Sequence, residues 1–214
     1  MILTLSHQKG GVGKSTIAWN LAVLFSKIIP TKIIDLDTQQ TLSVTNDIRQ
    51  SVGLEALSII KIESADALAH YIENDKDDEL TIIDSGGFDS AYNRLAIIGS
   101  DMLVTPVSDK PFDLMGLQKY EEILSSLSEI QGETIQSNIV LNNLNPAMKK
   151  YGDIVDYLCQ SDYFELLTSV LKQRVDVAHS VGDGKSVKEY RRFSKADQEF
   201  DMLFEEIKEK LNIL

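Results

Sequence analysis

The sequence predicts a doubly wound α/β fold, in which helices cover both faces of a mostly parallel sheet. Two observations indicate this fold: short apolar runs alternate with helical patterns along the chain, and the runs lack the polar alternation of a half-exposed sheet. The chain has 214 residues, of which 43% are hydrophobic and 25% charged, as in an ordinary globular protein. It contains no internal repeat, low-complexity tract or linker, so we predict a single domain over residues 1–214.

The predicted strands are apolar runs of about four to eight residues. They cover Ile2–Ser6, Lys32–Asp35, Leu57–Ile62, Leu80–Asp84, Met102–Val107 and Ile135–Asn142. The predicted helices follow most of these strands and have apolar residues at helical spacing. They cover Thr16–Ile28, Ser64–Glu73, Ser90–Ile98, Leu114–Ile130, Met148–Cys159 and Lys195–Leu211.

A glycine-rich stretch, Lys9-Gly10-Gly11-Val12-Gly13-Lys14-Ser15, lies between the first predicted strand and the first predicted helix. Strand, glycine loop and helix in this order predict a phosphate-binding P-loop. Glycines let several backbone N–H groups point into one concavity, and the N-terminus of the helix favours an anion. We therefore expect the backbone of Gly10–Thr16 to hold phosphates, Lys14 to reach the β- and γ-phosphates, and Ser15 to bind magnesium.

Three aspartates are expected at the edge of the sheet where the P-loop lies. Asp35 and Asp37 end the second predicted strand and, being two residues apart in extended chain, point to the same side. Asp84 ends the apolar run Thr81-Ile82-Ile83, which is the arrangement of a Walker B magnesium site. Each aspartate alone is equally explained by a turn or a helix cap. Together they predict a metal site made of Ser15, Asp35 and Asp84.

The P-loop departs from the usual G-x-x-x-x-G-K-[ST] pattern, because Gln8 replaces the first glycine and a second lysine, Lys9, follows it. This K-G-G-x-G-K-[ST] variant resembles the deviant Walker A motif of the ParA/MinD ATPases. The resemblance implies that Lys9 reaches the nucleotide of a second subunit in an ATP-dependent homodimer. It also implies a catalytic set of Lys9, Lys14 and Asp37, because Asp35-Leu36-Asp37-Thr38-Gln39 resembles the stretch whose second aspartate activates water in that family.

Further stretches resemble small ParA-type proteins that lack an N-terminal DNA-binding domain. They are Ser100–Val107 with Pro111-Phe112-Asp113, and Gln173-Arg174-Val175 with Gly184–Glu189. The stretch Asn142-Asn143-Leu144-Asn145 lacks the lysine and aspartate of a guanine-specific N-K-x-D motif, so adenine is favoured and ATP is the expected nucleotide. Asn142 resembles the family asparagine near the base, although a turn asparagine is an equally good interpretation.

The charge of the chain is unevenly distributed. The formal net charge is −12, but Lys172–Lys195 contains seven basic and three acidic residues. In ParA relatives a basic C-terminal surface binds DNA without sequence preference, which implies a DNA-binding role for Lys185, Lys188, Arg191, Arg192 and Lys195. The alternative is a solvated face with ordinary ion pairs to the acidic body.

No signal peptide or run of eighteen apolar residues is present, and the amphipathic C-terminal stretch carries acids as well as lysines. We therefore expect a cytoplasmic protein without a membrane partner, whose last helix packs on the sheet. The DNA binding that the resemblance implies would make it nucleoid-associated. The single cysteine, Cys159, excludes a disulfide framework within the chain and is expected in the core.

The motifs predict a Mg²⁺-dependent ATPase, and the resemblance to ParA-type proteins implies that it dimerises around ATP, binds DNA nonspecifically and drives plasmid or chromosome partition. The resemblance adds a DNA-bound, ParB-like adaptor that stimulates hydrolysis. One alternative is a MinD-like ATPase that positions another cargo or the division apparatus. Another is an enzyme that uses the same loop to activate a carboxylate with ATP.

Overall fold

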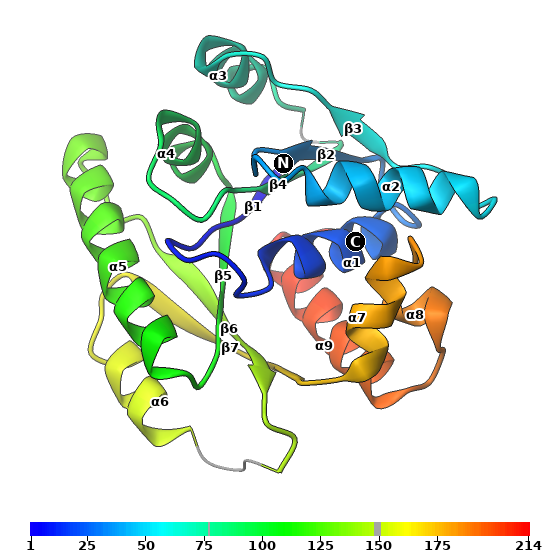
Figure 1. Cartoon of the computed structure of the whole chain (residues 1–214). Coiled ribbons are helices and arrows are strands. Elements are labelled where there is room, and N and C mark those ends of the chain that lie inside the picture. Colours follow the sequence, from blue (N-terminus) through cyan, green and yellow to red (C-terminus); the bar gives the residue numbers. More distant parts are fainter. Residues whose placement is uncertain (77, 148–150) are drawn as a thin grey trace.

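A parallel sheet of seven strands forms the middle layer of the computed structural model, which describes residues 1–76, 78–147 and 151–214 (Figure 1). Its strand order is β3-β2-β4-β1-β5-β6-β7, and each neighbouring pair is parallel. The strands are β1 (Ile2–Leu5), β2 (Thr31–Asp35), β3 (Ser58–Ile60), β4 (Leu80–Asp84), β5 (Met102–Val107), β6 (Ser137–Leu144) and β7 (Phe164–Lys172). The helices are α1 (Lys14–Phe25), α2 (Thr41–Ser51), α3 (Ala65–Glu73), α4 (Ala91–Ile98), α5 (Pro111–Gln131), α6 (Gly152–Leu158), α7 (Val175–Gly182), α8 (Val187–Tyr190) and α9 (Lys195–Lys210). The predicted doubly wound α/β fold is confirmed.

Consecutive residues of each strand enter different cores, because successive side chains in a strand point to opposite faces. Leu3, Ile33 and Ile82 join the core under α1 and α9, whereas Ile34 and Ile83 join the core under α3 and α4. A third cluster packs α5 and α6 on the face that α3 and α4 cover, toward β5 and β6. Because both faces are buried, the strands are apolar without alternation.

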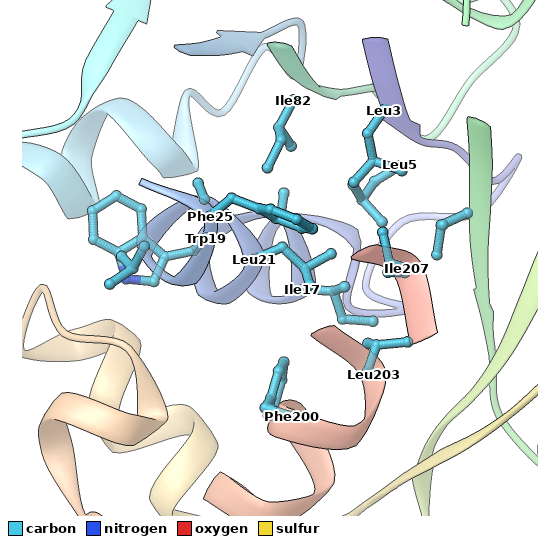
Figure 2. Close-up of a cluster of buried hydrophobic side chains, with 14 of the residues drawn as sticks. Leu3, Leu5, Ile17, Trp19, Leu21, Phe25, Ile82, Phe200, Leu203 and Ile207 are labelled. Atoms are coloured by element: carbon cyan, nitrogen blue, oxygen red, sulfur yellow. The ribbon is translucent and has the colours of Figure 1, made fainter. Parts of the chain in front are cut away.

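Helices α1 and α9 build the largest core together. Figure 2 shows side chains of Leu3, Leu5 and Ile82 from the sheet near those of α1, with Leu203 and Ile207 of α9 beside them. Phe25 of α1 and Phe204 of α9 have ring centroids 4.7 Å apart. The prediction that the C-terminal helix packs on the sheet is therefore confirmed. None of the helices in the described residues is both long and apolar enough to cross a membrane.

The strand order places the candidate site at the centre of the sheet. β1 lies between β4 and β5, and the register pairs Leu5 with Asp84 and Asp84 with Asp35. The loop after β1 therefore begins beside the ends of β4 and β2, at the carboxyl edge where ligands of open α/β sheets bind.

Four elements were not predicted: α2, β7, α7 and α8. Strand β6 also begins two residues later than predicted and continues through Leu144, which places Asn142 within the strand. The predicted helix Met148–Cys159 begins at residues that lie outside the described part of the chain, and α6 is described from Gly152. The prediction that Cys159 lies in the core is wrong. Cys159 is exposed because it follows α6 as its C-cap, after the last buried residue of the helix, Leu158.

Candidate nucleotide-binding site

The loop between β1 and α1 depends on two glycines in left-handed backbone. Gly11 has φ +75° and Gly13 has φ +102°, a region that L side chains rarely adopt. A Cβ at Gly13 would also lie 2.3 Å from the amide nitrogen of Asn142. Gly13 is the N-cap of α1, and within the described residues no side chain caps this helix end. The N–H groups of the first turn are therefore available to an anion.

Lys14, the first residue of α1, is held inside this loop. Its side chain is buried, and its Nζ donates a hydrogen bond to the carbonyl oxygen of Lys9 at 3.1 Å. Burial lowers the pKa of the Lys14 ammonium, whereas attraction to Asp84 and Asp37 opposes that shift. A phosphate bound in the loop would supply a counter-charge close to the ammonium and offset this burial.

Asp84, at the end of β4, is fully buried. Neither of its carboxylate oxygens accepts a hydrogen bond of normal length and angle from another described residue. Burial raises the pKa of Asp84 to about 7, with a further contribution from Asp35, while the nearby Ser15 hydroxyl and Lys14 lower it. Two buried carboxylate oxygens without donors match the needs of a hard cation. Asp84 and the Ser15 hydroxyl therefore fit Mg²⁺ at this position.

Asp35 has a different surrounding, although it pairs with Asp84 in the sheet register. Its carboxylate accepts hydrogen bonds from the backbone N–H groups of Leu42 at 3.0 Å, Ser43 at 3.3 Å and Asp37 at 3.3 Å. These contacts fix the N-terminus of α2, a polar helix that has no side-chain cap at Gln40. In the part of the chain that the structure describes, no three His, Cys, Asp or Glu residues are grouped to hold a metal. Asp35 therefore caps α2 in this structure, and its role as a metal ligand stays a prediction.

Asp37 lies on the loop that leaves β2, half-exposed at the same edge. Its Oδ1 accepts a hydrogen bond from the backbone N–H of Gln39 at 2.9 Å, which orients the carboxylate. The charge of Asp37 raises the pKa of Asp84 and opposes the lowering of the Lys14 pKa. Asp37, Asp84 and Lys14 are therefore near one another, as the sequence predicts.

The loop after β4 packs against the start of the P-loop. A Cβ at Gly87 would lie 2.7 Å from the backbone nitrogen of Gly10, so a larger residue there would displace one loop. The amide of Asn93 in α4 donates to the carbonyl oxygens of Gly86 at 3.1 Å and Phe88 at 2.5 Å. The two loops are therefore in contact, and a movement of one affects the other.

Lys9 is half-buried and close to α5. Its backbone N–H donates to Nδ1 of His7 at 3.0 Å. Gly116 of α5 lies so close that a Cβ added to it would be 3.3 Å from the Cβ of Lys9. With Gln8, Met115 and Lys119 it lines a shallow cavity of about 390 Å³. Lys9 is thus at the surface of the P-loop that a second molecule could approach, whereas Lys14 is inside the loop.

A larger cleft of about 580 Å³ adjoins the P-loop. Its near wall contains Gly11, Gly13, Thr16 and Asn142. The amide of Asn142 donates to the carbonyl oxygen of Val12 at 2.7 Å and so ties β6 to the P-loop. Its lining also contains the stretch Gln173-Arg174-Val175 together with Pro146, Ala178 and Phe200. The cleft has the position and size for a nucleoside whose phosphates lie on the P-loop.

The predicted DNA-binding residues lie on α8 and around the start of α9, and they differ in their contacts. Lys188 forms an ion pair with Asp201 at 2.7 Å, and Lys185 is half-buried. Arg191, Arg192 and Lys195 are exposed. Arg191 lies 3.6 Å from Asp176, a long ion pair at the surface. The exposed cationic group therefore consists of Arg191, Arg192 and Lys195.

The segment that carries these cations is attached to the P-loop helix. Nε1 of Trp19 donates to the carbonyl oxygen of Lys185 at 3.0 Å, and the side-chain oxygen of Asn20 accepts from the Val187 N–H at 2.8 Å. Buried Arg49 of α2 forms two hydrogen bonds with Glu189, at 2.7 and 2.8 Å. These contacts place the basic segment next to the nucleotide-binding half of the molecule.

The sequence did not single out Arg49, which binds Glu189, Asn93, which holds the loop after β4, or Phe193, whose ring is exposed in the basic segment. Arg49 lies in α2, which was not predicted, and Asn93 is one polar residue in an amphipathic helix. The signal for Phe193 was present, because a single aromatic residue follows two arginines in the basic segment.

Comparison with known proteins agrees with this geometry. The family described as "CobQ/CobB/MinD/ParA nucleotide binding domain" matches this chain over residues 3–187. The "Virulence plasmid ParA family protein pGP5-D" of Chlamydia psittaci is 24% identical, covering 95% of this chain and 92% of that protein.

Solved structures share the fold. The complex of Cyanothece McdA with ATP superposes with a TM-score of 0.78 and 17% identity, covering 100% of this chain and 96% of that one. A plasmid partition protein of Borrelia burgdorferi B31 bound to AMPPNP gives a TM-score of 0.69 and 17% identity, covering 98% of both chains. The P-loop, the two loops beside it and the match over most of the sequence lead to one conclusion: the chain belongs to the CobQ/CobB/MinD/ParA family of nucleotide-binding proteins.

Proposed function

We propose that the protein is a Mg²⁺-dependent ATPase of the ParA type, which dimerises around ATP, binds DNA nonspecifically and acts in plasmid or chromosome partition. The observation that carries this proposal is the burial of Lys14 near Asp84, whose carboxylate oxygens accept no hydrogen bond from the described residues. Such an arrangement is costly in the free protein and is relieved by a phosphate for the lysine and a cation for the aspartate.

Each residue of the site has a role that its geometry supports. The backbone of Gly10–Thr16 and the Lys14 ammonium bind the phosphates, and Ser15 and Asp84 hold the metal. Bound Mg²⁺ would supply neutralisation of phosphate charge. Asp37, oriented by the Gln39 N–H, positions the attacking water.

The nucleoside is proposed to occupy the 580 Å³ cleft, with Asn142 at its edge. One amide hydrogen of Asn142 is donated to the Val12 carbonyl oxygen. The side-chain oxygen and the second amide hydrogen can therefore bind a base or ribose.

Lys9 is proposed to act on the nucleotide of a second subunit. Its half-buried position beside the cavity of Gln8, Met115 and Lys119 supports an approach by another molecule at this surface. A cation from the partner would stabilise the charge that develops on the transferred phosphoryl group, as an arginine finger does. Turnover would therefore depend on dimerisation, and a DNA-bound, ParB-like adaptor would stimulate it.

The DNA contact is proposed for Arg191, Arg192 and Lys195, with smaller contributions from Lys185 and Lys188. The exposure of Arg191, Arg192 and Lys195 supports it, and so does the attachment of the preceding stretch at Lys185 and Val187 to α1. A cytoplasmic, nucleoid-associated location would follow from such a DNA contact.

Sedimentation velocity tests this function directly. The 23.9 kDa chain should sediment as a monomer with ADP or without nucleotide, and at twice that mass with ATP or a nonhydrolysable analogue. Duplex DNA of arbitrary sequence should co-sediment only with the ATP form at low salt. A Lys9→Ala variant should bind ATP and stay monomeric.

The other outcomes identify the competing functions. An ATP-dependent dimer that does not bind DNA would favour a MinD-like ATPase that positions another cargo. Absence of phosphate release until an organic acid is added would favour a carboxylate-activating enzyme.

A further inference from the structure

The turn between α8 and α9 presents an aromatic ring to solvent. Phe193 is 75% exposed, whereas Phe200, seven residues later, is 3% exposed. Exposing a phenylalanine forgoes the stabilisation that its burial would give. The position of Phe193 therefore has no explanation in the packing of the described residues.

The backbone conformation of Phe193 is also energetically unfavourable. Its φ of +64° lies in the left-handed region, which is a genuine outlier for a bulky residue and which glycine adopts without strain. The conformation is fixed by α9, because the Phe193 N–H donates to the Asp197 carboxylate at 2.6 Å and Gln198 donates to the Phe193 carbonyl at 3.2 Å. Strain held in place by neighbouring groups is common at functional sites.

One cation contacts the ring, and two more are close to it in the sequence. The Arg192 guanidinium lies 4.9 Å from the ring centroid, Arg191 is 70% exposed, and Lys195 is exposed two residues later. A cavity of about 470 Å³ lies between this turn and the start of α7, where Asp176 is the acidic residue in its lining. The rest of the protein is strongly acidic, so this turn is a local exception in charge.

An exposed aromatic ring with adjacent arginines matches the chemistry of nucleobase recognition. Arginines bind phosphates, and the flat face of the ring stacks on a base irrespective of its identity. The same ring inserted into a duplex must first separate two stacked bases, which is costly. Bases that are already exposed are therefore the better partner.

We propose that Phe193 is a base-stacking residue, which adds affinity for single-stranded or locally unstacked DNA to the phosphate contacts by which this surface binds duplex. This inference rests on the proposed DNA-binding function and deepens it. Arg191, Arg192 and Lys195 supply the salt-dependent part of the affinity, and Phe193 supplies a part that is insensitive to salt.

The test compares two single-stranded oligonucleotides of equal length and charge, oligo(dT) and an abasic strand, by fluorescence anisotropy with a nonhydrolysable ATP analogue. The wild-type protein should bind oligo(dT) more tightly. Phe193→Ala should lose about 5- to 150-fold in affinity for oligo(dT) and little for the abasic strand. Its slope of log affinity against log salt should stay unchanged, because no phosphate contact is removed.

Two control variants separate stacking from a structural role. Phe193→Tyr keeps an aromatic face and should bind oligo(dT) like the wild type. Phe193→Gly removes the ring and relieves the left-handed strain, so it should bind weakly although its melting temperature rises. A merely structural role for Phe193 would instead make weaker binding accompany a lower melting temperature.

The remaining outcomes overturn the inference in distinguishable ways. If wild-type protein and Phe193→Ala bind both strands equally while duplex DNA is still bound at low salt, base stacking is refuted and the proposed function survives. If the wild type binds no DNA at any salt concentration, the proposed function fails as well. If it binds phosphatidylserine vesicles through Phe193 and not oligo(dT), the surface recognises membranes.

Discussion

The P-loop edge of the sheet and the basic turn before α9 both concentrate charge, but they hold it in opposite surroundings. At the P-loop edge, Lys14 and Asp84 are buried, and the Asp84 carboxylate oxygens lack hydrogen-bond donors among the described residues. At the basic turn, Arg191 and Arg192 are exposed to solvent. Buried charge depends on a ligand to become favourable, whereas exposed charge is already hydrated and is screened by salt. Substitutions at the two regions should therefore differ in kind and in size.

The largest effect is expected at the buried lysine. Lys14→Ala should abolish measurable ATP binding, because it removes the cation that the site places inside the phosphate loop. Isothermal titration calorimetry with ATP and Mg²⁺ provides the measurement. Lys27→Ala, an exposed lysine just after α1, is the matched control and should bind ATP normally. Equal affinity in the two variants would refute the assignment of Lys14.

Asp37 should separate binding from turnover. Asp37→Ala should keep ATP affinity close to that of the wild type and lower the hydrolysis rate by about 10²- to 10⁴-fold, since a residue that positions water acts in the chemical step. Phosphate release under saturating ATP measures this, and the exposed Asp47→Ala in α2 is the control. Rapid turnover by Asp37→Ala would show that another group orients the water.

Two arginine–carboxylate pairs of similar geometry test the contrast in burial itself. Arg49 is buried and binds Glu189 at 2.7 and 2.8 Å, while Arg94 is partly exposed and binds Asp89 at 2.7 and 2.8 Å. Arg49→Ala should lower the free energy of unfolding by about 1–3 kcal/mol, because it leaves the carbonyls of Glu55 and Gly184 without this donor and Glu189 without its cation. Arg94→Ala should cost about 1 kcal/mol or less.

Urea unfolding of the two variants gives both numbers. Equal losses of stability would mean that burial does not separate the two pairs and that α8 is not held to α2 by Arg49.

Asp84 should make the ligand-free protein less stable as pH rises. The folded state keeps a proton on Asp84 up to about pH 7, whereas an unfolded aspartate ionises near pH 4, so between these values the folded state binds more protons. The free energy of unfolding should therefore fall across this window, by about 1–4 kcal/mol. Asp84→Asn should remove this part of the pH dependence.

Urea unfolding at pH 5 and pH 8, without nucleotide or metal, measures the difference, with the exposed Asp47→Asn as control. At pH 8, Mg²⁺ with ATP should stabilise the wild type more than Asp84→Asn. Identical pH profiles for the wild type and Asp84→Asn would contradict the buried, unpaired state of this carboxylate.

The sequence was most informative where local pattern and function coincide. The central strands β1, β4 and β5 are mostly apolar runs, and the P-loop has glycines that its positive φ angles require. These features are encoded by neighbouring residues. They could therefore be predicted without knowledge of the tertiary structure.

The missed elements depend on distant partners. Helix α2 is largely polar and β-branched, and its N-terminus is fixed by Asp35, seven residues before Leu42. The edge strand β7 alternates buried and exposed residues and does not form a continuous apolar run. The capping box of Ser186 and Glu189 at α8 was visible in the sequence, but a helix of four residues carries little other signal.

The aspartates show the same distinction within the site. Asp35, Asp37 and Asp84 all follow apolar strands, so sequence alone assigned both Asp35 and Asp84 to a metal. Only the tertiary contacts separate them, because backbone N–H groups satisfy Asp35 and none reaches Asp84 among the described residues. Likewise, ion pairing of Lys188 with Asp201 distinguishes it from Arg192.

The rate of ATP hydrolysis per subunit, measured over a wide range of protein concentrations, tests most directly whether a second copy completes the site. If Lys9 acts in a partner's site, this rate should rise with concentration until dimers dominate, and Lys9→Ala should show a low rate that does not change with concentration. A wild-type rate per subunit that is constant at every concentration, and equal to that of Lys9→Ala, would contradict a shared active site.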